Sequence, residues 1–157
     1  MTSTHLMNSL IKNYQSKNYK NVMIICEQIL KLNKDIPDVY NFYGLALQNL
    51  KKHKQAINYF NKAISLNPHH VVANSNLGTV LKIQGKLDES ILAFEKAISI
   101  NPNYYIAYNN MGNVLKEQGK LDKAIIAFKK AISINPDYAE AYNDMGNALK
   151  EQGKLDK

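Results

Sequence analysis

A repeat of 34 residues runs along the chain and constrains its fold more than any other feature. Several residue types recur at this spacing, each in a column of its own. The glycines are Gly44, Gly78, Gly112 and Gly146, the prolines are Pro68, Pro102 and Pro136, and the phenylalanines are Phe60, Phe94 and Phe128. Near the C-terminus, residues 108–123 return almost unchanged as residues 142–157. A fixed period of this length indicates a stacked array of small supersecondary units.

Residues 105–138 show what one unit contains. Apolar residues follow a helical spacing in both halves of this segment, which predicts two amphipathic helices. Gly119 and Lys120 lie between the halves, and such a short connection makes neighbouring helices antiparallel. Pro136 ends the second helix, because proline cannot continue a helix and moves the preceding residue away from helical dihedral angles. Each unit is therefore predicted to be a helix–turn–helix.

The glycine column lies inside the first helix of each unit. Glycine there costs about 1 kcal/mol relative to alanine, so its recurrence predicts a packing role. Small residues recur in the second helix at Ala56, Ser90 and Ala124. We expect the missing Cβ of Gly112 to let the two backbones of a pair approach closely, while Phe128 fills the wider end.

The residues that recur in one unit resemble the tetratricopeptide repeat. They are Tyr108, Met111, Gly112, Leu115, Gly119, Leu121, Ala124, Phe128, Ala131 and Pro136. The resemblance implies an all-α fold, a right-handed superhelical solenoid of antiparallel helix pairs with about four and a half repeats. Residues 37–70, 71–104 and 105–138 match the pattern in full, and residues 139–157 match its first helix only.

The two ends of the chain depart from the pattern. Residues 1–36 are interpreted as a divergent N-terminal capping repeat, because Leu10 replaces the glycine and Lys34 replaces the proline. In residues 139–157 the apolar side chains of Tyr142, Met145 and Leu149 are expected to lack a partner helix. Two explanations stay open: the chain is part of a longer array, or another copy covers this face.

Composition limits the classes of function. The formal net charge is +7 and the pI is near 9.3, yet all 20 basic residues are lysines. Arginine is the residue that reads guanine and phosphate with two parallel hydrogen bonds, whereas lysine offers a mobile point charge. The lysines are also spread over every unit. This pattern favours a solvated surface over a nucleic-acid surface.

Cysteine content and hydropathy favour a soluble, cytoplasmic protein. The single Cys26 cannot form an intramolecular disulfide, which fits a reducing compartment. Because Cys26 falls in the phenylalanine column, we expect it to be a small buried hydrophobic residue. The N-terminus lacks an apolar run of signal-peptide length, and no segment approaches the roughly 18 apolar residues of a membrane span.

The resemblance also implies a place for a ligand, since first helices of the family line a concave groove that holds extended peptides. The implied residues are carboxamides, hydroxyls and lysines, with one carboxylate and one leucine. They are Asn41, Leu45, Gln48, Asn49, Ser75, Asn76, Thr79, Lys82, Asn109, Asn110, Asn113, Lys116, Asn143, Asp144, Asn147 and Lys150. Asparagine donates and accepts, so a row of them can pair with a peptide backbone of any sequence. The alternative is that these asparagines only fill a polar surface.

A second ligand mode of the family, the clamping of acidic C-terminal tails by lysine and arginine, is not expected. The matching positions hold Asn41, Leu45, Ser75 and Asn109, and arginine is absent. The row of asparagines instead resembles the repeats of O-linked N-acetylglucosamine transferases, which also carry a segment like residues 116–122.

We find no catalytic, metal or cofactor site in the sequence. His69 and His70 are adjacent at a unit junction, and no histidine has Cys, Asp or Glu at metal-site spacing. Asp88, Glu89 and Asp122 begin second helices, where negative charge favours the helix dipole. Asparagines recur before each junction and are predicted to be C-terminal caps; they are Asn33, Asn67, Asn101 and Asn135.

The sequence therefore predicts a non-catalytic scaffold that binds a protein or an extended peptide in an asparagine-rich groove. It predicts neither membrane insertion nor nucleic-acid binding. One alternative is the substrate-recruiting arm of a larger enzyme, such as a glycosyltransferase. Another is self-association through the incomplete C-terminal repeat.

Overall fold

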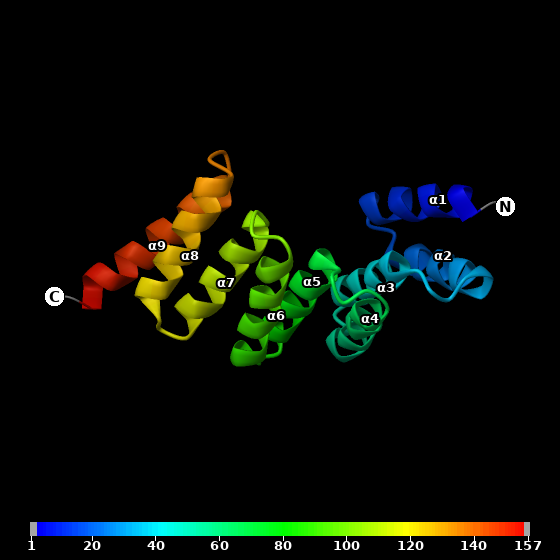
Figure 1. Cartoon of the computed structure of the whole chain (residues 1–157), viewed down its shortest axis with the longest axis horizontal. Helices are drawn as coiled ribbons and strands as arrows, with labels where there is room; N and C mark the ends of the chain where they lie inside the picture. The colour runs from blue at the N-terminus through cyan, green and yellow to red at the C-terminus, as the bar shows by residue number, and fades with distance from the viewer. Residues whose placement is uncertain (1–2, 156–157) are drawn as a thin grey trace. The chain divides into compact units, whose positions relative to one another are not determined.

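The structure is a computed structural model that describes residues 3–155, and this segment folds into nine helices without a β-strand (Figure 1). The helices are α1 (Ser3–Gln15), α2 (Tyr19–Leu32), α3 (Pro37–Asn49), α4 (His53–Leu66), α5 (Val71–Ile83), α6 (Leu87–Ile100), α7 (Tyr105–Glu117), α8 (Leu121–Ile134) and α9 (Ala139–Leu155). The prediction of an all-α fold built from helix pairs is confirmed. None of the helices in residues 3–155 has the length and apolar composition needed to cross a bilayer.

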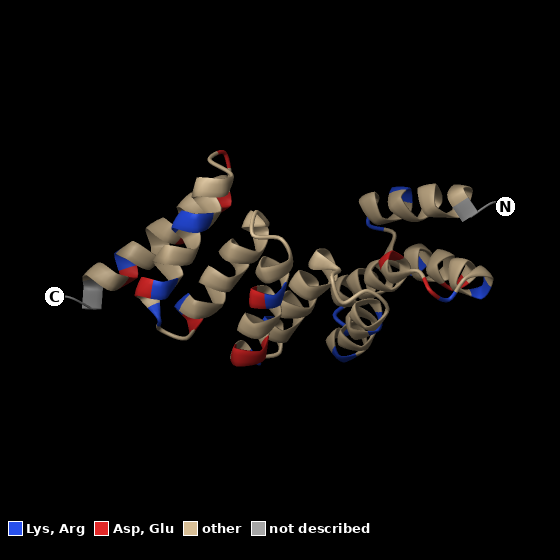
Figure 2. Ribbon diagram, viewed as in Figure 1, with Lys and Arg blue, Asp and Glu red and all other residues tan. Residues whose placement is uncertain are grey.

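The starts of the helices follow from residues near their N-termini. Pro37 is at the first position of α3, where its missing N–H is not needed by the helix. Asp88 and Glu89 lie in the first turn of α6, and Asp122 lies in the first turn of α8, as predicted (Figure 2). Their charges favour the positive end of the helix dipole.

The second helices end at the predicted asparagine caps. Asn135 has extended dihedral angles, φ −128° and ψ 93°, and its N–H donates to the carbonyl oxygen of Ala131 at 2.9 Å. The Oδ1 atom of its side chain accepts a hydrogen bond from the N–H of Asp137 at 3.2 Å, which closes a turn into the next repeat. Asn33, Asn67 and Asn101 adopt the same arrangement.

The turn from first to second helix uses one residue in the left-handed conformation. In the α7–α8 turn this residue is Gly119, with φ 73°, and its N–H donates to the carbonyl oxygen of Lys116 at 2.8 Å. The N–H of Lys120 donates to the carbonyl oxygen of Leu115 at 2.9 Å, which completes a Schellman cap. The column of left-handed residues is Lys17, Lys51, Gly85 and Gly119.

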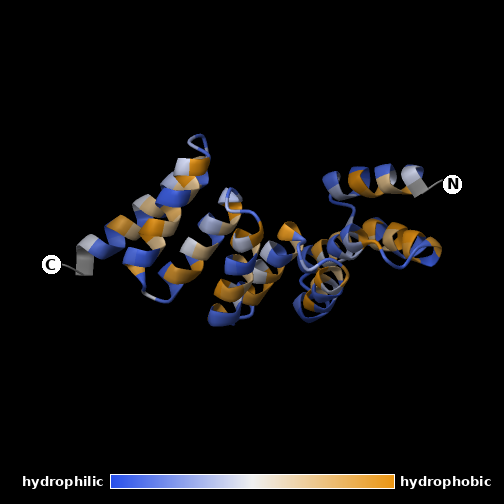
Figure 3. Cartoon of the chain, viewed as in Figure 1, coloured by the Kyte–Doolittle hydropathy of each residue, from blue (hydrophilic) through white to orange (hydrophobic). Residues whose placement is uncertain are grey.

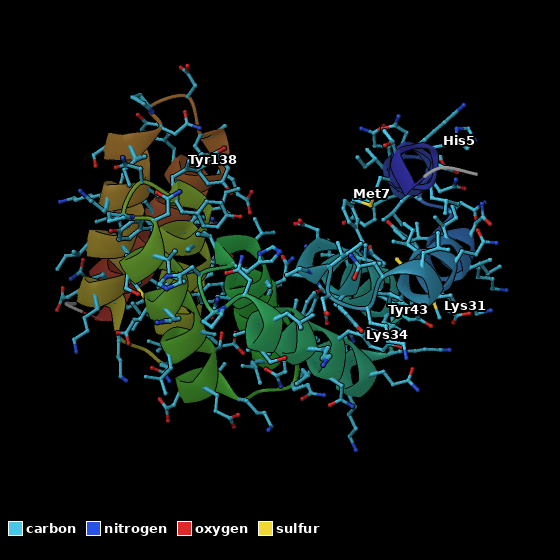
Figure 4. The ribbon with its side chains drawn as sticks, turned by 45° about the vertical axis from the view of Figure 1, so that its right-hand side comes forward. His5, Met7, Lys31, Lys34, Tyr43 and Tyr138 are labelled. Atoms are coloured by element: carbon cyan, nitrogen blue, oxygen red, sulfur yellow. The ribbon has the colours of Figure 1, made fainter. Side chains whose placement is uncertain are left out.

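Residues 1–80 form one compact unit, which contains α1 to α4 and most of α5. Its core is a continuous apolar cluster in which Leu10, Val22, Phe60 and Val80 are fully buried. Leu10 occupies the position of the missing glycine, and Met7 of α1 packs against the same cluster (Figure 4). Residues 3–36 therefore form a genuine helix pair of this unit.

Residues 81–157 form the second compact unit, which contains the end of α5 and the helices α6 to α9. Phe128 is fully buried in its core, together with Ala124 and Ala148. Polar and apolar residues alternate around each helix, as the amphipathic pattern predicts (Figure 3). In α9, Tyr142 and Leu149 are about half exposed, at 47% and 46%, while Met145 packs against the core.

The glycine column has a packing role, but its contact differs from the prediction. A Cβ added to Gly112 would lie 2.6 Å from Cε1 of Phe128, and one added to Gly44 would lie 2.6 Å from Cε1 of Phe60. The glycine thus makes room for the phenylalanine ring, and the expected approach of two helix backbones is not its closest contact. A Cβ on Gly146 would meet no atom within 4 Å, so this member of the column is free of the constraint.

Candidate functional site

The predicted ligand-binding residues lie on the first helices, namely α3, α5, α7 and α9. We call the surface that they form the first-helix face, and we describe it within each compact unit. In the second unit it comprises α7, α9 and Lys82 at the end of α5. In the first unit it comprises α3 and the part of α5 up to Val80.

A hydrogen-bonded cluster around Asp144 organises the first-helix face of the second unit. The side-chain amide of Asn113 donates to Oδ2 of Asp144 at 2.6 Å, and that of Asn109 donates to the same oxygen at 3.1 Å. Asn109 is fully buried, and Asp144 and Asn113 are half-buried. Hydrogen bonds to a carboxylate are stronger than neutral ones, so this cluster holds α7 and α9 together through polar groups.

The first unit contains a simpler form of the same link. The side-chain amide of Asn76 on α5 donates to Oδ1 of Asn41 on α3 at 2.9 Å. Asn41 is 5% exposed and occupies the column of Asn109, while Asn76 occupies the column of Asp144. Corresponding positions of successive first helices are therefore hydrogen-bonded in both units.

The predicted residues fall into three groups according to their solvent exposure. Three are buried, and they support the surface from beneath: Asn41, Ser75 and Asn109. The half-buried group is Leu45, Gln48, Asn76, Thr79, Lys82, Asn110, Asn113, Lys116 and Asp144. The exposed group is Asn49, Asn143, Asn147 and Lys150. A ligand on this face would meet the second and third groups.

Some accessible polar groups bond to their own helix. Asn49 donates from its amide to the carbonyl oxygen of Leu45 at 2.9 Å, and the Thr79 hydroxyl donates to the carbonyl oxygen of Ser75 at 3.2 Å. Lys82 lies 3.9 Å from the carboxylate of Glu117, at the limit of an ion pair. Because all of these contacts lie near the surface, each contributes little to stability.

Histidine and cysteine have structural positions. Nδ1 of His70 accepts from the N–H of Ala73 at 3.2 Å, so His70 caps the start of α5, and its Nε2 lies 3.2 Å from Oδ1 of Asp38. Cys26 is fully buried, and burial, with a smaller effect from Glu27, raises the pKa of its thiol to about 12. Within residues 3–155, no three or more His, Cys, Asp or Glu side chains gather as metal ligands would.

A second set of side-chain links between repeats was missed from the sequence. The amide of Gln118 donates to Oδ1 of Asp88 at 2.8 Å, and the amide of Gln152 donates to Oδ1 of Asp122 at 2.6 Å. In each pair the glutamine lies 30 residues after the aspartate, so its side chain contacts the preceding repeat. The sequence contains a pattern that could have indicated these links, because Gln118 and Gln152, like Asp88 and Asp122, are separated by the 34-residue period.

Comparison with known proteins agrees with this architecture. A family model described as TPR repeat matches residues 78–119 and 112–153, and models described as tetratricopeptide repeat match residues 37–70 and 59–91. The TPR repeat-containing protein MJ1345 of Methanocaldococcus jannaschii is 31% identical over 67 residues, which are 43% of this chain and 21% of that protein. Tetratricopeptide repeat protein 37 of Xenopus laevis is 33% identical over 66 residues, 42% of this chain and 4% of that protein.

Solved structures with the same fold cover almost the whole chain. The crystal structure of MamA is 26% identical, with a TM-score of 0.80, over 96% of this chain and 82% of that one. YrrB, described as a TPR protein with an unusual peptide-binding site, is 25% identical, with a TM-score of 0.76, over 90% of this chain and 73% of that one. The matched family models together with the helix pairs, their glycine–phenylalanine contacts and their asparagine caps place the chain in the tetratricopeptide repeat family.

Proposed function

We propose that the chain is a non-catalytic interaction scaffold that binds an extended peptide segment of a protein partner on its first-helix face. The observation that carries the proposal is the row of accessible carboxamides on α7 and α9, one of which, Asn113, is held by a hydrogen bond to Asp144. Asn110 and Asn113 belong to α7, and Asn143 and Asn147 belong to α9. YrrB, with its peptide-binding site, supports the same class of ligand.

The chemistry of the row suits a peptide backbone. A carboxamide offers two N–H donors and one carbonyl acceptor, so it pairs with the N–H and C=O groups of an extended chain regardless of side chains. Asn113 is held by its bond to Asp144, and less side-chain freedom is lost when such a group binds a ligand. Lys116 and Lys150 occupy one column beside the row, where they favour a partner with acidic residues.

A peptide array probed with the full chain tests this proposal. The variant Asn110→Ala/Asn147→Ala removes two accessible carboxamides and leaves the three residues of the Asp144 cluster unchanged. We expect it to lose most of the peptides that the parent chain retains. The matched control is Lys129→Ala/Lys130→Ala on the exposed side of α8, which we expect to retain them. A double asparagine variant that captures the same peptides as strongly as the parent would exclude the first-helix face.

A second candidate function is the recruiting arm of a larger protein. The matched stretch spans about a fifth of the archaeal relative and 4% of the frog relative, so similar repeats occur in longer proteins. In that setting the first-helix face would hold a substrate for a catalytic domain of the same polypeptide. Assay of the natural full-length product for activity on the peptides captured by the array would test it, and binding without turnover would favour the scaffold.

A further inference from the structure

A groove in the second unit lies on the other side of α7 from the Asp144 cluster residues. It has a volume of about 520 Å³ and runs between α6 and α8. Its floor is formed by Tyr108, Met111 and Leu115 of α7, and its rims carry Leu92 of α6 and Ile126 of α8. A cavity of this size is in the range of specific binding sites.

The rims of the groove expose apolar side chains to solvent. Ile126 is 67% exposed and Leu92 is 64% exposed, which places both among the most exposed large apolar residues in the described part of the chain. Single exposed apolar residues are common on protein surfaces. Here, however, they flank one apolar floor, and a contiguous apolar surface with a polar border marks interaction sites.

The first unit shows what the same groove looks like when two tyrosine rings interrupt it. Two periods earlier in the sequence, Met111 is replaced by Tyr43 and Ala127 by Tyr59. The two tyrosine rings stack at 4.0 Å between centroids, and the Tyr43 hydroxyl donates to Oε1 of Glu27 at 2.8 Å. The stack lies at the corresponding place between α2, α3 and α4.

This tyrosine stack divides the groove of the first unit into two hollows. One hollow of about 420 Å³ includes Lys31 and Lys34, which lie at the same edge of the unit as Tyr43 (Figure 4). The other, of about 300 Å³, includes Met23 and Gln55, and Tyr43 and Tyr59 line both. In the second unit Met111 and Ala127 leave the groove continuous. The two units therefore provide a divided and a continuous form of the same groove.

The open groove has walls of opposite charge. Asp88 and Glu95 line the α6 side, while Lys120 and Lys123 line the α8 side. All four side chains are exposed, and none of them forms an ion pair among the described residues. Asp88 accepts one hydrogen bond, from the Gln118 amide. The walls are thus available to charges of a ligand.

We propose that this groove binds one amphipathic α-helix of a partner protein, with its apolar stripe on α7, basic residues toward α6 and acidic residues toward α8. Asp88 and Glu95 are seven residues apart on α6, which is about two helical turns or roughly 10 Å. The groove is built from helices, whose backbone groups are already paired, so it offers no edge for an extended strand. A helix satisfies its own backbone and brings side chains at the i, i+4 and i+7 positions into such a groove.

Fluorescence anisotropy with a designed helical peptide of about 15 residues tests the proposal. The peptide carries leucines at i, i+4 and i+7, lysines along one side of this stripe and glutamates along the other. A second peptide has glutamine at every lysine and glutamate position, so it lacks the charges whichever way it lies in the groove. We expect the parent chain to bind the first peptide with a micromolar Kd and the second at least tenfold more weakly. Equal affinity for both peptides would contradict the charge assignment.

The decisive variant is Met111→Tyr/Ala127→Tyr, which transfers the tyrosine stack of the first unit into the groove. Because the same pair is accommodated between α2, α3 and α4, we expect the variant to fold and to bind the first peptide at least tenfold more weakly. Undiminished binding would overturn the proposal. Lys120→Glu/Lys123→Glu is a second variant, and its loss of affinity should disappear at high salt.

The first-helix face and the groove are tested independently. Asn110→Ala/Asn147→Ala should leave binding of the designed helix unchanged, since neither residue lines the groove. Binding of a small apolar probe such as 1-anilinonaphthalene-8-sulfonate to the parent chain, with no binding of either peptide, would assign the groove to small ligands and contradict a helical partner.

Discussion

At the scale of single residues, the repeat pattern mixes positions with different physical constraints. Gly112 and Gly146 occupy one column, yet only Gly112 faces a phenylalanine ring at a distance that excludes a Cβ. Asn109 and Asn110 are neighbours of the same type, yet Asn109 is fully buried and Asn110 is half-buried. Recurrence of a residue type therefore does not by itself show whether it packs, caps or contacts a ligand.

Substitution of the two glycines by alanine should have opposite effects. In Gly112→Ala the new Cβ would lie 2.6 Å from the Phe128 ring, and we expect overpacking to cost about 1–3 kcal/mol of unfolding free energy. In Gly146→Ala nothing lies within 4 Å, so the helix should gain about 0.5–1 kcal/mol. Urea titrations followed by circular dichroism would measure both. Equal stabilisation by the two changes would show that the ring contact is not a constraint.

Cys26 should behave as a core residue toward thiol reagents. Burial raises the pKa of its thiol to about 12, so the reactive thiolate is nearly absent at pH 8 in the folded state. We expect 5,5′-dithiobis(2-nitrobenzoic acid) to label the native chain at a rate set by opening of the structure. In denaturing urea, labelling should be complete within minutes. Fast stoichiometric labelling of the native chain at pH 8 would contradict the burial of this thiol.

At the scale of helices and turns, the sequence predicts most of the architecture because one period contains both the helices and their ends. The asparagine caps, the acidic first turns and the short turn at Gly119 all follow from local residue chemistry. The left-handed conformation of Lys17 and Lys51 was not predicted, because lysine carries no preference for positive φ. Only alignment with Gly85 and Gly119 in the same column indicates it.

The positive φ angles of Lys17 and Lys51 lead to a second prediction about stability. An L-residue in the left-handed region costs about 1–2 kcal/mol, so Lys51→Gly should raise the free energy of unfolding by about 1 kcal/mol. The adjacent Lys52 has φ −88°, and Lys52→Gly should instead lower stability through a more flexible unfolded chain. The two variants are compared by urea titration under the same conditions. Stabilisation by Lys52→Gly and not by Lys51→Gly would be inconsistent with the turn geometry.

At the scale of the whole molecule, the chain consists of two compact units divided between Val80 and Leu81, inside α5. The period does not predict this division, because α5 belongs to a repeat that matches the pattern in full. The open groove was missed because the residues that line it differ between repeats. The sequence shows Met111 and Ala127 in the columns of Tyr43 and Tyr59. It does not show that these two columns face each other in the fold, so the groove between them could not be predicted.

The family resemblance predicts a row of ligand-binding residues, and the structure divides the residues of that row by depth. Asn41, Ser75 and Asn109 are buried, so under the proposed function they support the surface, and the accessible carboxamides of α7 and α9 would contact the ligand. The rotation of each helix about its axis decides this division. The residue type alone does not reveal that rotation, because the buried Asn109 and the half-buried Asn110 are adjacent asparagines.

The central claim, that a peptide partner binds the first-helix face, is tested most directly by nuclear magnetic resonance titration of the 17.8 kDa chain with a peptide captured from the array. We predict that the largest shift changes occur in the side-chain amides of Asn110, Asn113 and Asn147 and in the backbone amides of α7 and α9. Shift changes confined to the second helices, with these three side-chain amides unchanged, would contradict the account.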